Sequence, residues 1–229
     1  LLDLGAAVDI AWFPEASSRR ERGRYDVTLV EGSISTPEAL AHVADLRRRT
    51  RTLVTIGACA TAGGIQALRN FAAAGEFAAA VYARPEYVAT LDRATPIAAH
   101  VPVDFELRGC PIDKRQLVGL LTALLAGRKP DIPAHSVCME CKAAGRVCVM
   151  VAHGTPCLGP VTQAGCGALC PACHRGCYGC FGAQEAANTP ALSARLATLG
   201  LGERELRRVY RTFTAGDPAF RAEADRHDP

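Results

Sequence analysis

The chain has 229 residues, of which 49% are hydrophobic and 21% charged, as in ordinary soluble globular proteins and unlike disordered chains. Its net charge of +3 is small, and its arginine runs at residues 19–24 and 47–51 lack interleaved aromatic residues, so we expect no nucleic-acid partner. No apolar run could span a membrane and no signal-peptide pattern opens the sequence, so we expect a cytoplasmic protein without a membrane span.

The first half alternates short β-rich runs with helical stretches. We expect strands at residues 6–13, 25–32, 52–57 and 103–109, which are rich in branched and aromatic residues. A helix is predicted over 35–49, starting at a Ser-x-x-Glu pattern of Ser35 and Glu38, and another over 113–127, from Asp113 to Gly127. Strands that alternate with helices predict an α/β domain with a doubly wound parallel sheet over residues 1–127.

The second half, predicted as a small irregular domain over residues 134–229, follows a linker at 127–133. Nine of the chain's eleven cysteines lie between residues 136 and 182. An odd number of cysteines without a secretion signal argues against disulfides and favours metal binding. This glycine-rich segment has little helix or strand periodicity, so we expect a metal rather than an apolar core of its own to order it. A final helical stretch at 191–213 is expected to pack back on the body.

The spacing of these cysteines gives two sets of four thiols. The first reads C-x2-C-x6-C-x8-C and the second C-x3-C-x6-C-x2-C, and their members are Cys138, Cys141, Cys148 and Cys157, then Cys166, Cys170, Cys177 and Cys180. Four thiolates suit a [4Fe-4S] cluster, whose sulfurs the small neighbours Gly165, Gly167, Gly176 and Gly179 would leave open to hydrogen bonds. Four thiolates also suit zinc. Cys173 could replace Cys166 in the second set, and His135 could replace one thiolate in the first.

Two cysteines of the first half, Cys59 and Cys110, each follow a predicted strand, as does Glu31. Loops beyond the carboxyl ends of parallel strands line the ligand crevice of an open α/β sheet. We therefore expect Cys59 and Cys110 to share a site, although two ligands make only half of one.

Five segments resemble the small, electron-transferring subunit of [NiFe] hydrogenases, especially the cytoplasmic type that is linked to NAD(P) and is similar to sulfhydrogenase delta subunits. They are VEGSISTPE, TIGACATAGGIQALRNF, HVPVDFELRGCPIDKRQL, PCLGPVTQAGCGALCP and RGCYGCFG. The resemblance implies a flavodoxin-like domain with a proximal [4Fe-4S] cluster, followed by a domain with a medial and a distal cluster. By position, Cys59 and Cys110 resemble proximal ligands, the set that begins at Cys138 the distal ligands, and the set that begins at Cys166 the medial ligands.

The resemblance also implies an oxidoreductase subunit that carries electrons and no catalytic residues of its own. Its partners would be a large subunit with a nickel-iron centre and a flavin or iron-sulfur subunit of the diaphorase type. Glu31 would relay protons, shape the proximal site or simply end a strand. The alternatives are an iron-sulfur subunit similar to one of complex I, which needs only the proximal cluster, and an interaction module ordered by zinc.

The sequence departs from the family at its front. The family begins with a strand and a C-x2-C loop that supplies two further proximal ligands before a helix like LLDL, and neither precedes that segment here. In a flavodoxin-like sheet of order 2-1-3-4-5 this strand is an interior one. We therefore expect a truncated chain whose neighbouring strands face each other across a gap, with unpaired backbone groups and poor stability.

Overall fold

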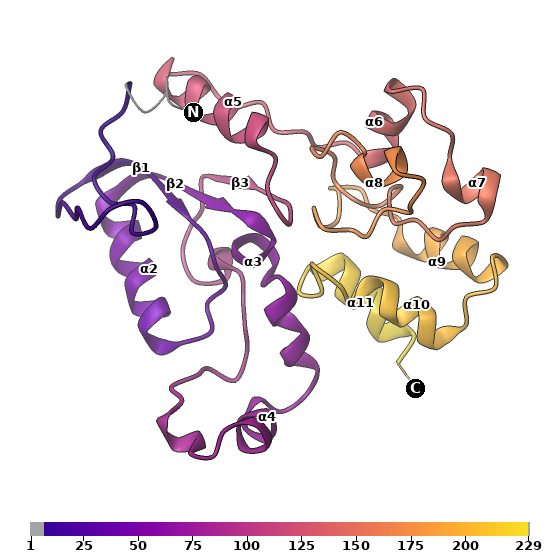
Figure 1. Ribbon diagram of the computed structural model, residues 1–229, viewed down its shortest axis with the longest axis horizontal. Coiled ribbons are helices and arrows are strands. Elements are labelled where there is room, and N and C mark those ends of the chain that lie inside the picture. Colours follow the sequence, from indigo (N-terminus) through magenta and orange to yellow (C-terminus); the bar gives the residue numbers. More distant parts are fainter. Residues whose placement is uncertain (1–6, 229) are drawn as a thin grey trace.

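The computed structural model describes residues 7–228 and shows an α/β first half beside a helical, cysteine-rich second half (Figure 1). Three parallel strands, β1 (Tyr25–Val30), β2 (Thr50–Ile56) and β3 (Phe105–Leu107), pair in the order β1-β2-β3. Three of the four predicted strands are thus confirmed, and the parallel α/β sheet with them.

Helices cover both faces of this sheet. α2 (Pro37–Arg49) packs on the face that carries Leu53, and α5 (Lys114–Leu125) packs on the face that carries Val54, and both of these β2 side chains are fully buried. Because neighbouring residues of a strand point to opposite faces, a run of consecutive apolar residues marks a strand with helices on both sides.

The ends of the two helices follow short side-chain signals. The Thr36 hydroxyl accepts a hydrogen bond from the Ala39 backbone, so the cap of α2 is Thr36 and the prediction of Ser35 is wrong by one residue. Asp113 caps α5 as predicted, by accepting hydrogen bonds from the Arg115 and Gln116 backbone. Side-chain oxygens at these positions satisfy amides that have no partner inside the helix.

One expectation about the front of the chain is wrong. Residues 7–13 form no strand, and only an isolated bridge joins Trp12 to Arg20; Ala6 and the LLDL segment lie outside the described residues. In the order 2-1-3-4-5 the missing strand would lie between the strands predicted at 6–13 and 25–32. Among residues 7–228, β1 pairs with β2 alone, from Tyr25 opposite Thr50 to Val30 opposite Thr55, and no strand lies along its other edge. The expected gap and poor stability therefore stay predictions.

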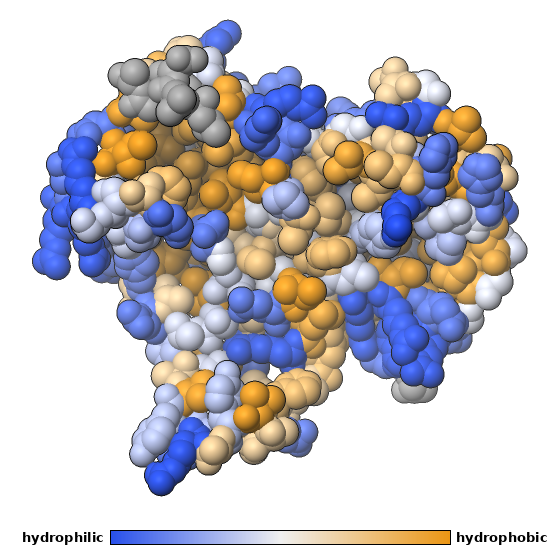
Figure 2. All heavy atoms as spheres, in the orientation of Figure 1, coloured by the Kyte–Doolittle hydropathy of each residue, from blue (hydrophilic) through white to orange (hydrophobic). Residues whose placement is uncertain are grey.

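A long excursion separates β2 from β3. It runs through α3 (Gly57–Ala62), η1 (Ile65–Phe71), α4 (Ala74–Val81), η2 (Pro85–Tyr87) and η3 (Ile97–Ala99). α4 lies at the tip of a projection and buries none of its side chains (Figure 1). Its Phe77 and Val81 are exposed, and Figure 2 shows apolar side chains on this projection at the bottom of the view.

The second half consists of short helices around a single apolar cluster. The helices are α6 (Val137–Ala143), α7 (Val149–His153), α8 (Leu169–Ala172), α9 (Thr189–Thr198), α10 (Glu203–Tyr210) and α11 (Pro218–Arg226). Cysteine-segment residues such as Val137 and Leu158 pack with Leu196, Tyr210 and Phe220 of α9–α11. The segment therefore shares a core with the terminal helices, which pack back on it as predicted, and the expectation that it has no apolar core of its own stands. The predicted helix over 191–213 is two helices, since the chain turns at Gly200 and Gly202.

Within residues 7–228, no helix has both the length and the apolar character that a membrane span requires.

Candidate metal centres

The first candidate site lies where β2 and β3 end. Cys59 is in the first turn of α3, directly after β2, and not in a loop as predicted; Cys110 follows β3. Burial raises the pKa of the Cys59 thiol, nearby Cys110 and Glu31 raise it further, and a hydrogen bond from the Ile65 backbone opposes them. The structure therefore brings together the three residues that the sequence placed at the ends of separate strands.

Backbone contacts hold these two ligand loops side by side. The Ala58 amide donates to the Gly109 carbonyl at 2.8 Å, which links the residues that precede Cys59 and Cys110. Gly64 lies against Cys59 so closely that an added Cβ would stand 2.4 Å from its Sγ. Gly64 thus leaves room for the Cys59 thiol beside the carboxyl end of β2.

The second candidate site gathers the first predicted set of four thiols. Cys138 and Cys141 lie on α6, Cys148 directly precedes α7, and Cys157 follows α7 and is buried. Burial, followed by the proximity of Cys157, Cys141 and Cys148, raises the pKa of the Cys138 thiol to about 11. A spacing of three residues on a helix puts two side chains on one face, which explains how C-x2-C presents both thiols to the same space.

Backbone amides approach the sulfurs from within the protein. The Cys157 Sγ accepts from the Cys177 amide at 3.1 Å and from the Gly159 amide at 3.4 Å, and the Gly179 amide approaches the Cys177 Sγ at 3.4 Å. Gly179 was among the glycines predicted for such contacts, whereas Gly159 was missed although it stands two residues after a cysteine. Such donors stabilise negative charge on sulfur.

The third candidate site gathers the second predicted set of four thiols, whose members differ in burial. Cys180 lies near Cys166 and Cys170, and also near Cys110 of the first half; burial raises the pKa of its thiol to about 11, against a hydrogen bond from the Cys110 backbone. Cys177 is the most enclosed member, and burial raises the pKa of its thiol to about 12. Cys177 also contacts Cys157 of the second site, so the two thiol sets adjoin.

The alternative ligands lie at the surface. Cys173 is exposed, whereas Cys166, which it would replace, is half-buried and close to Cys170. His135 is exposed too, as are His153 and His174.

Sequence reasoning missed a carboxylate that ties two ligand loops together. Glu140 stands between Cys138 and Cys141, and its two oxygens accept from the Gly165 amide at 2.9 Å and from the Ala168 amide at 3.1 Å. The Cys166 loop is therefore held by the helix that carries the other thiol set. A Glu inside a C-x2-C spacing was the signal available in the sequence.

All eleven cysteines are free thiols, and none is paired in a disulfide. In the part of the chain that the structure describes, no three His, Cys, Asp or Glu side chains converge to hold a single metal ion. Four thiolates are the ligands both of a [4Fe-4S] cluster and of a structural zinc ion, so the donor chemistry of the two thiol sets fits either group.

Comparisons with known proteins identify relatives of this chain among the subunits of redox enzymes. The family described as "NADH ubiquinone oxidoreductase, 20 Kd subunit" matches residues 1–124. Sulfhydrogenase 2 subunit delta from Pyrococcus furiosus is 37% identical over 93% of this chain and 89% of its own. A subunit of the F420-non-reducing hydrogenase vhu from Methanococcus voltae is 29% identical over 80% of this chain and 74% of its own. A chain in a solved NAD+-reducing [NiFe]-hydrogenase is 30% identical, with a TM-score of 0.53 over 58% of this chain and 81% of that one.

A parallel α/β sheet with thiols at its carboxyl edge, followed by a thiol-rich helical half, provides the thiolate ligands that an iron-sulfur subunit of an oxidoreductase requires. The relatives above are hydrogenase subunits, which confirms the resemblance found in the sequence. The chain belongs to the family of the 20 Kd subunit of NADH ubiquinone oxidoreductase.

Proposed function

We propose that this chain is the electron-transfer small subunit of a cytoplasmic [NiFe] hydrogenase. The observation that carries the proposal is that the thiol sets adjoin one another. Cys110 at the sheet edge lies near Cys180 of the set that begins at Cys166, and Cys177 of the same set contacts Cys157 of the set that begins at Cys138. Three adjoining ligand sets suit stepwise electron transfer across the subunit. The nickel-iron chemistry would belong to a large subunit, so no side chain of this chain has a catalytic role.

The proposal assigns the ligands by their place in the two domains, residues 1–127 and 134–229. Cys59 and Cys110 would hold half of a proximal site, and two sets of four would hold [4Fe-4S] clusters: Cys138, Cys141, Cys148 and Cys157 as the distal set, and Cys166, Cys170, Cys177 and Cys180 as the medial set. Such a cluster, when bound, supplies one-electron redox chemistry. The protein's part is to ligate the iron, exclude water and direct backbone amides at the sulfurs.

The positions of the sites support an assignment of the partner that each site would face. The proximal residues stand at the carboxyl edge of the sheet, where Cys110 is exposed, so this edge would meet the large subunit. The distal set would face the second partner, a flavin or iron-sulfur subunit of the diaphorase type. Glu31 lies close enough to Cys59 to influence the charge of the proximal site.

A subunit similar to that of complex I is the second candidate, because the matching family carries that name. The family match ends at residue 124, before any of the nine later cysteines, whereas the match to sulfhydrogenase delta covers 93% of the chain. The thiol-rich half therefore favours the hydrogenase. A zinc-ordered module is disfavoured because the relatives that match 80% or more of this chain are hydrogenase subunits.

The test is anaerobic purification of the chain with its neighbouring gene products, followed by analysis for iron, acid-labile sulfide, nickel and zinc. We expect a brown complex that contains iron and sulfide in this subunit and nickel in its partner, with visible absorbance that bleaches on reduction. A pale, zinc-containing sample without sulfide would overturn the proposal. Iron and sulfide without a nickel-containing partner would favour the complex I-like candidate.

A further inference from the structure

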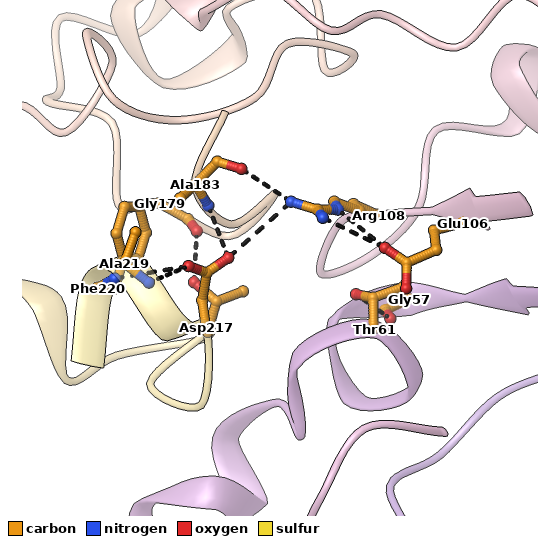
Figure 3. A network of polar contacts seen from close by, with 10 residues as sticks. Gly57, Thr61, Glu106, Arg108, Gly179, Ala183, Asp217, Ala219 and Phe220 are labelled. Atoms are coloured by element: carbon orange, nitrogen blue, oxygen red, sulfur yellow. Dashed lines mark hydrogen bonds and ion pairs between the residues drawn. The ribbon is translucent and has the colours of Figure 1, made fainter. Parts of the chain in front are cut away.

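Arg108 bridges the two halves of the molecule next to a ligand loop (Figure 3). It lies just after β3 and two residues before Cys110. Its guanidinium donates to the Ala183 carbonyl at 2.8 Å and pairs with Glu106 at 3.2 Å and with Asp217 at 3.9 Å. We refer to Glu106, Arg108, Ala183 and Asp217 as the Arg108 network.

The partner carboxylate in the second half is fixed from several sides. Asp217 is buried; one oxygen accepts from the Ala183 amide at 2.9 Å, and the other caps α11 by accepting from the Ala219 amide at 3.1 Å. The acceptors of Arg108 are therefore held by secondary structure, and moving the guanidinium would leave a buried charge without its counter-ion.

Other contacts also join the halves, and two of them lie at the ligand loops: a hydrogen bond from the Cys110 backbone to Cys180, and the packing of Gly109 against Phe181, whose ring would lie 2.7 Å from an added Cβ. Gly216 packs so closely that an added Cβ would stand 2.3 Å from the Ala62 carbonyl oxygen, and the guanidinium of Arg211 lies 4.0 Å from the ring centre of Phe71. These contacts can keep the halves together without Arg108. What Arg108 adds is a link between a residue two positions before Cys110 and one three positions after Cys180.

We infer that Arg108 is a positioning residue, which fixes the separation between the Cys110 loop and the Cys180 loop and thereby the spacing of the proximal and medial sites. The inference rests on the proposed function, because it assigns a purpose to that spacing. A guanidinium suits the task, since its planar fork binds a carbonyl and carboxylates at once. A lysine would keep the charge and lose the fork.

The test compares Arg108→Gln with the unaltered subunit in the assembled complex. We expect unchanged iron and sulfide content, altered dipolar splitting between the paramagnetic proximal and medial sites in EPR, and about tenfold faster hydrogen exchange at the amides of Cys110 and Ala183. Arg108→Lys should fall between the two, and it replaces Arg108→Gln if that variant does not fold.

Arg47→Gln is the matched control. Arg47 also pairs with a carboxylate, Asp104 at 2.7 Å, but within the first half and at the amino end of the strands. It should lower thermal stability without changing the splitting or the exchange at Cys110 and Ala183. Unchanged splitting and exchange in Arg108→Gln, or an equal change in Arg47→Gln, would overturn the inference. Hydrogen exchange needs no cluster, so a sample without iron would refute the proposed function and still test the Arg108 network.

Discussion

Gly64 shows how a single residue limits what can stand beside a thiol. Its φ of +61° is unfavourable for other residues, and an added Cβ would lie 2.4 Å from the Cys59 Sγ and 2.8 Å from its Cα. Gly64→Ala should lower the free energy of unfolding by about 3 kcal/mol, from backbone strain together with overpacking. Denaturant unfolding of the apo chain measures this loss.

Gly32→Ala is the control for that prediction, because Gly32 has a φ of +84° and no atoms near an added Cβ. Only backbone strain applies there, so we expect a loss of about 1 kcal/mol. Equal losses at the two positions would show that the contact with Cys59 carries no energy.

The two alternative thiols Cys166 and Cys173 give a second prediction at this scale. Cys166 is half-buried near Cys170, whereas Cys173 is exposed. Cys166→Ala should remove one cluster, a loss of about four iron atoms per chain, and Cys173→Ala should keep the full content. Iron analysis and EPR of both variants measure this difference; the reverse result would make Cys173 the ligand in place of Cys166.

Residue types and spacing predicted which thiols come together, because C-x2-C on a helix and a strand end both have fixed geometry. They did not predict the contacts of Glu140 or Arg108. Those partners, the Gly165 amide and Asp217, lie 25 and 109 residues away in the sequence, and such pairs depend on tertiary packing.

At the scale of elements, Asp104 links β2 to the turn before β3, because its carboxylate accepts a hydrogen bond from the Leu53 amide. Burial alone would raise the pKa of this carboxyl, but hydrogen bonds from the Leu53 backbone and from Arg47 lower it below its ordinary 3.8. A lowered pKa stabilises the fold above the ordinary value, and this stability is lost as pH falls below 3.8 towards the lowered pKa.

Asp104→Asn should therefore lower stability at neutral pH by about 1 kcal/mol, a small value because the carboxyl is partly exposed and screened. The difference between variant and unaltered chain should shrink at acid pH. Thermal unfolding between pH 2.5 and 7 measures it, and a difference that is constant over this range would contradict the assignment.

Strand and helix periodicity identified β1, β2, β3, α2 and α5 because each has a clear apolar pattern. The same patterns failed at 6–13, where the branched residues Val8 and Ile10 are exposed and no neighbouring strand pairs with them. The break between α9 and α10 was also missed, since the apolar spacing continues across Gly200 and Gly202 while the backbone turns.

At the scale of the whole molecule, the two halves differ in what keeps them folded. The first half has a paired sheet, whereas α6, α7 and α8 have only seven, five and four residues, too few to be stable alone. Removal of iron under reducing conditions should speed hydrogen exchange over residues 137–182 and leave β1–β3 and α9–α11 protected. A uniform loss of protection would mean that the halves unfold as one unit.

The parallel direction of the three strands separates the two rims of the sheet. Cys59, Cys110 and Glu31 emerge at one rim, while Arg24 and Thr50 mark the other, a strand length of about 20 Å away. A fluorescent label or affinity handle attached near Arg24 would therefore lie away from the rim that carries the thiols and leave them untouched.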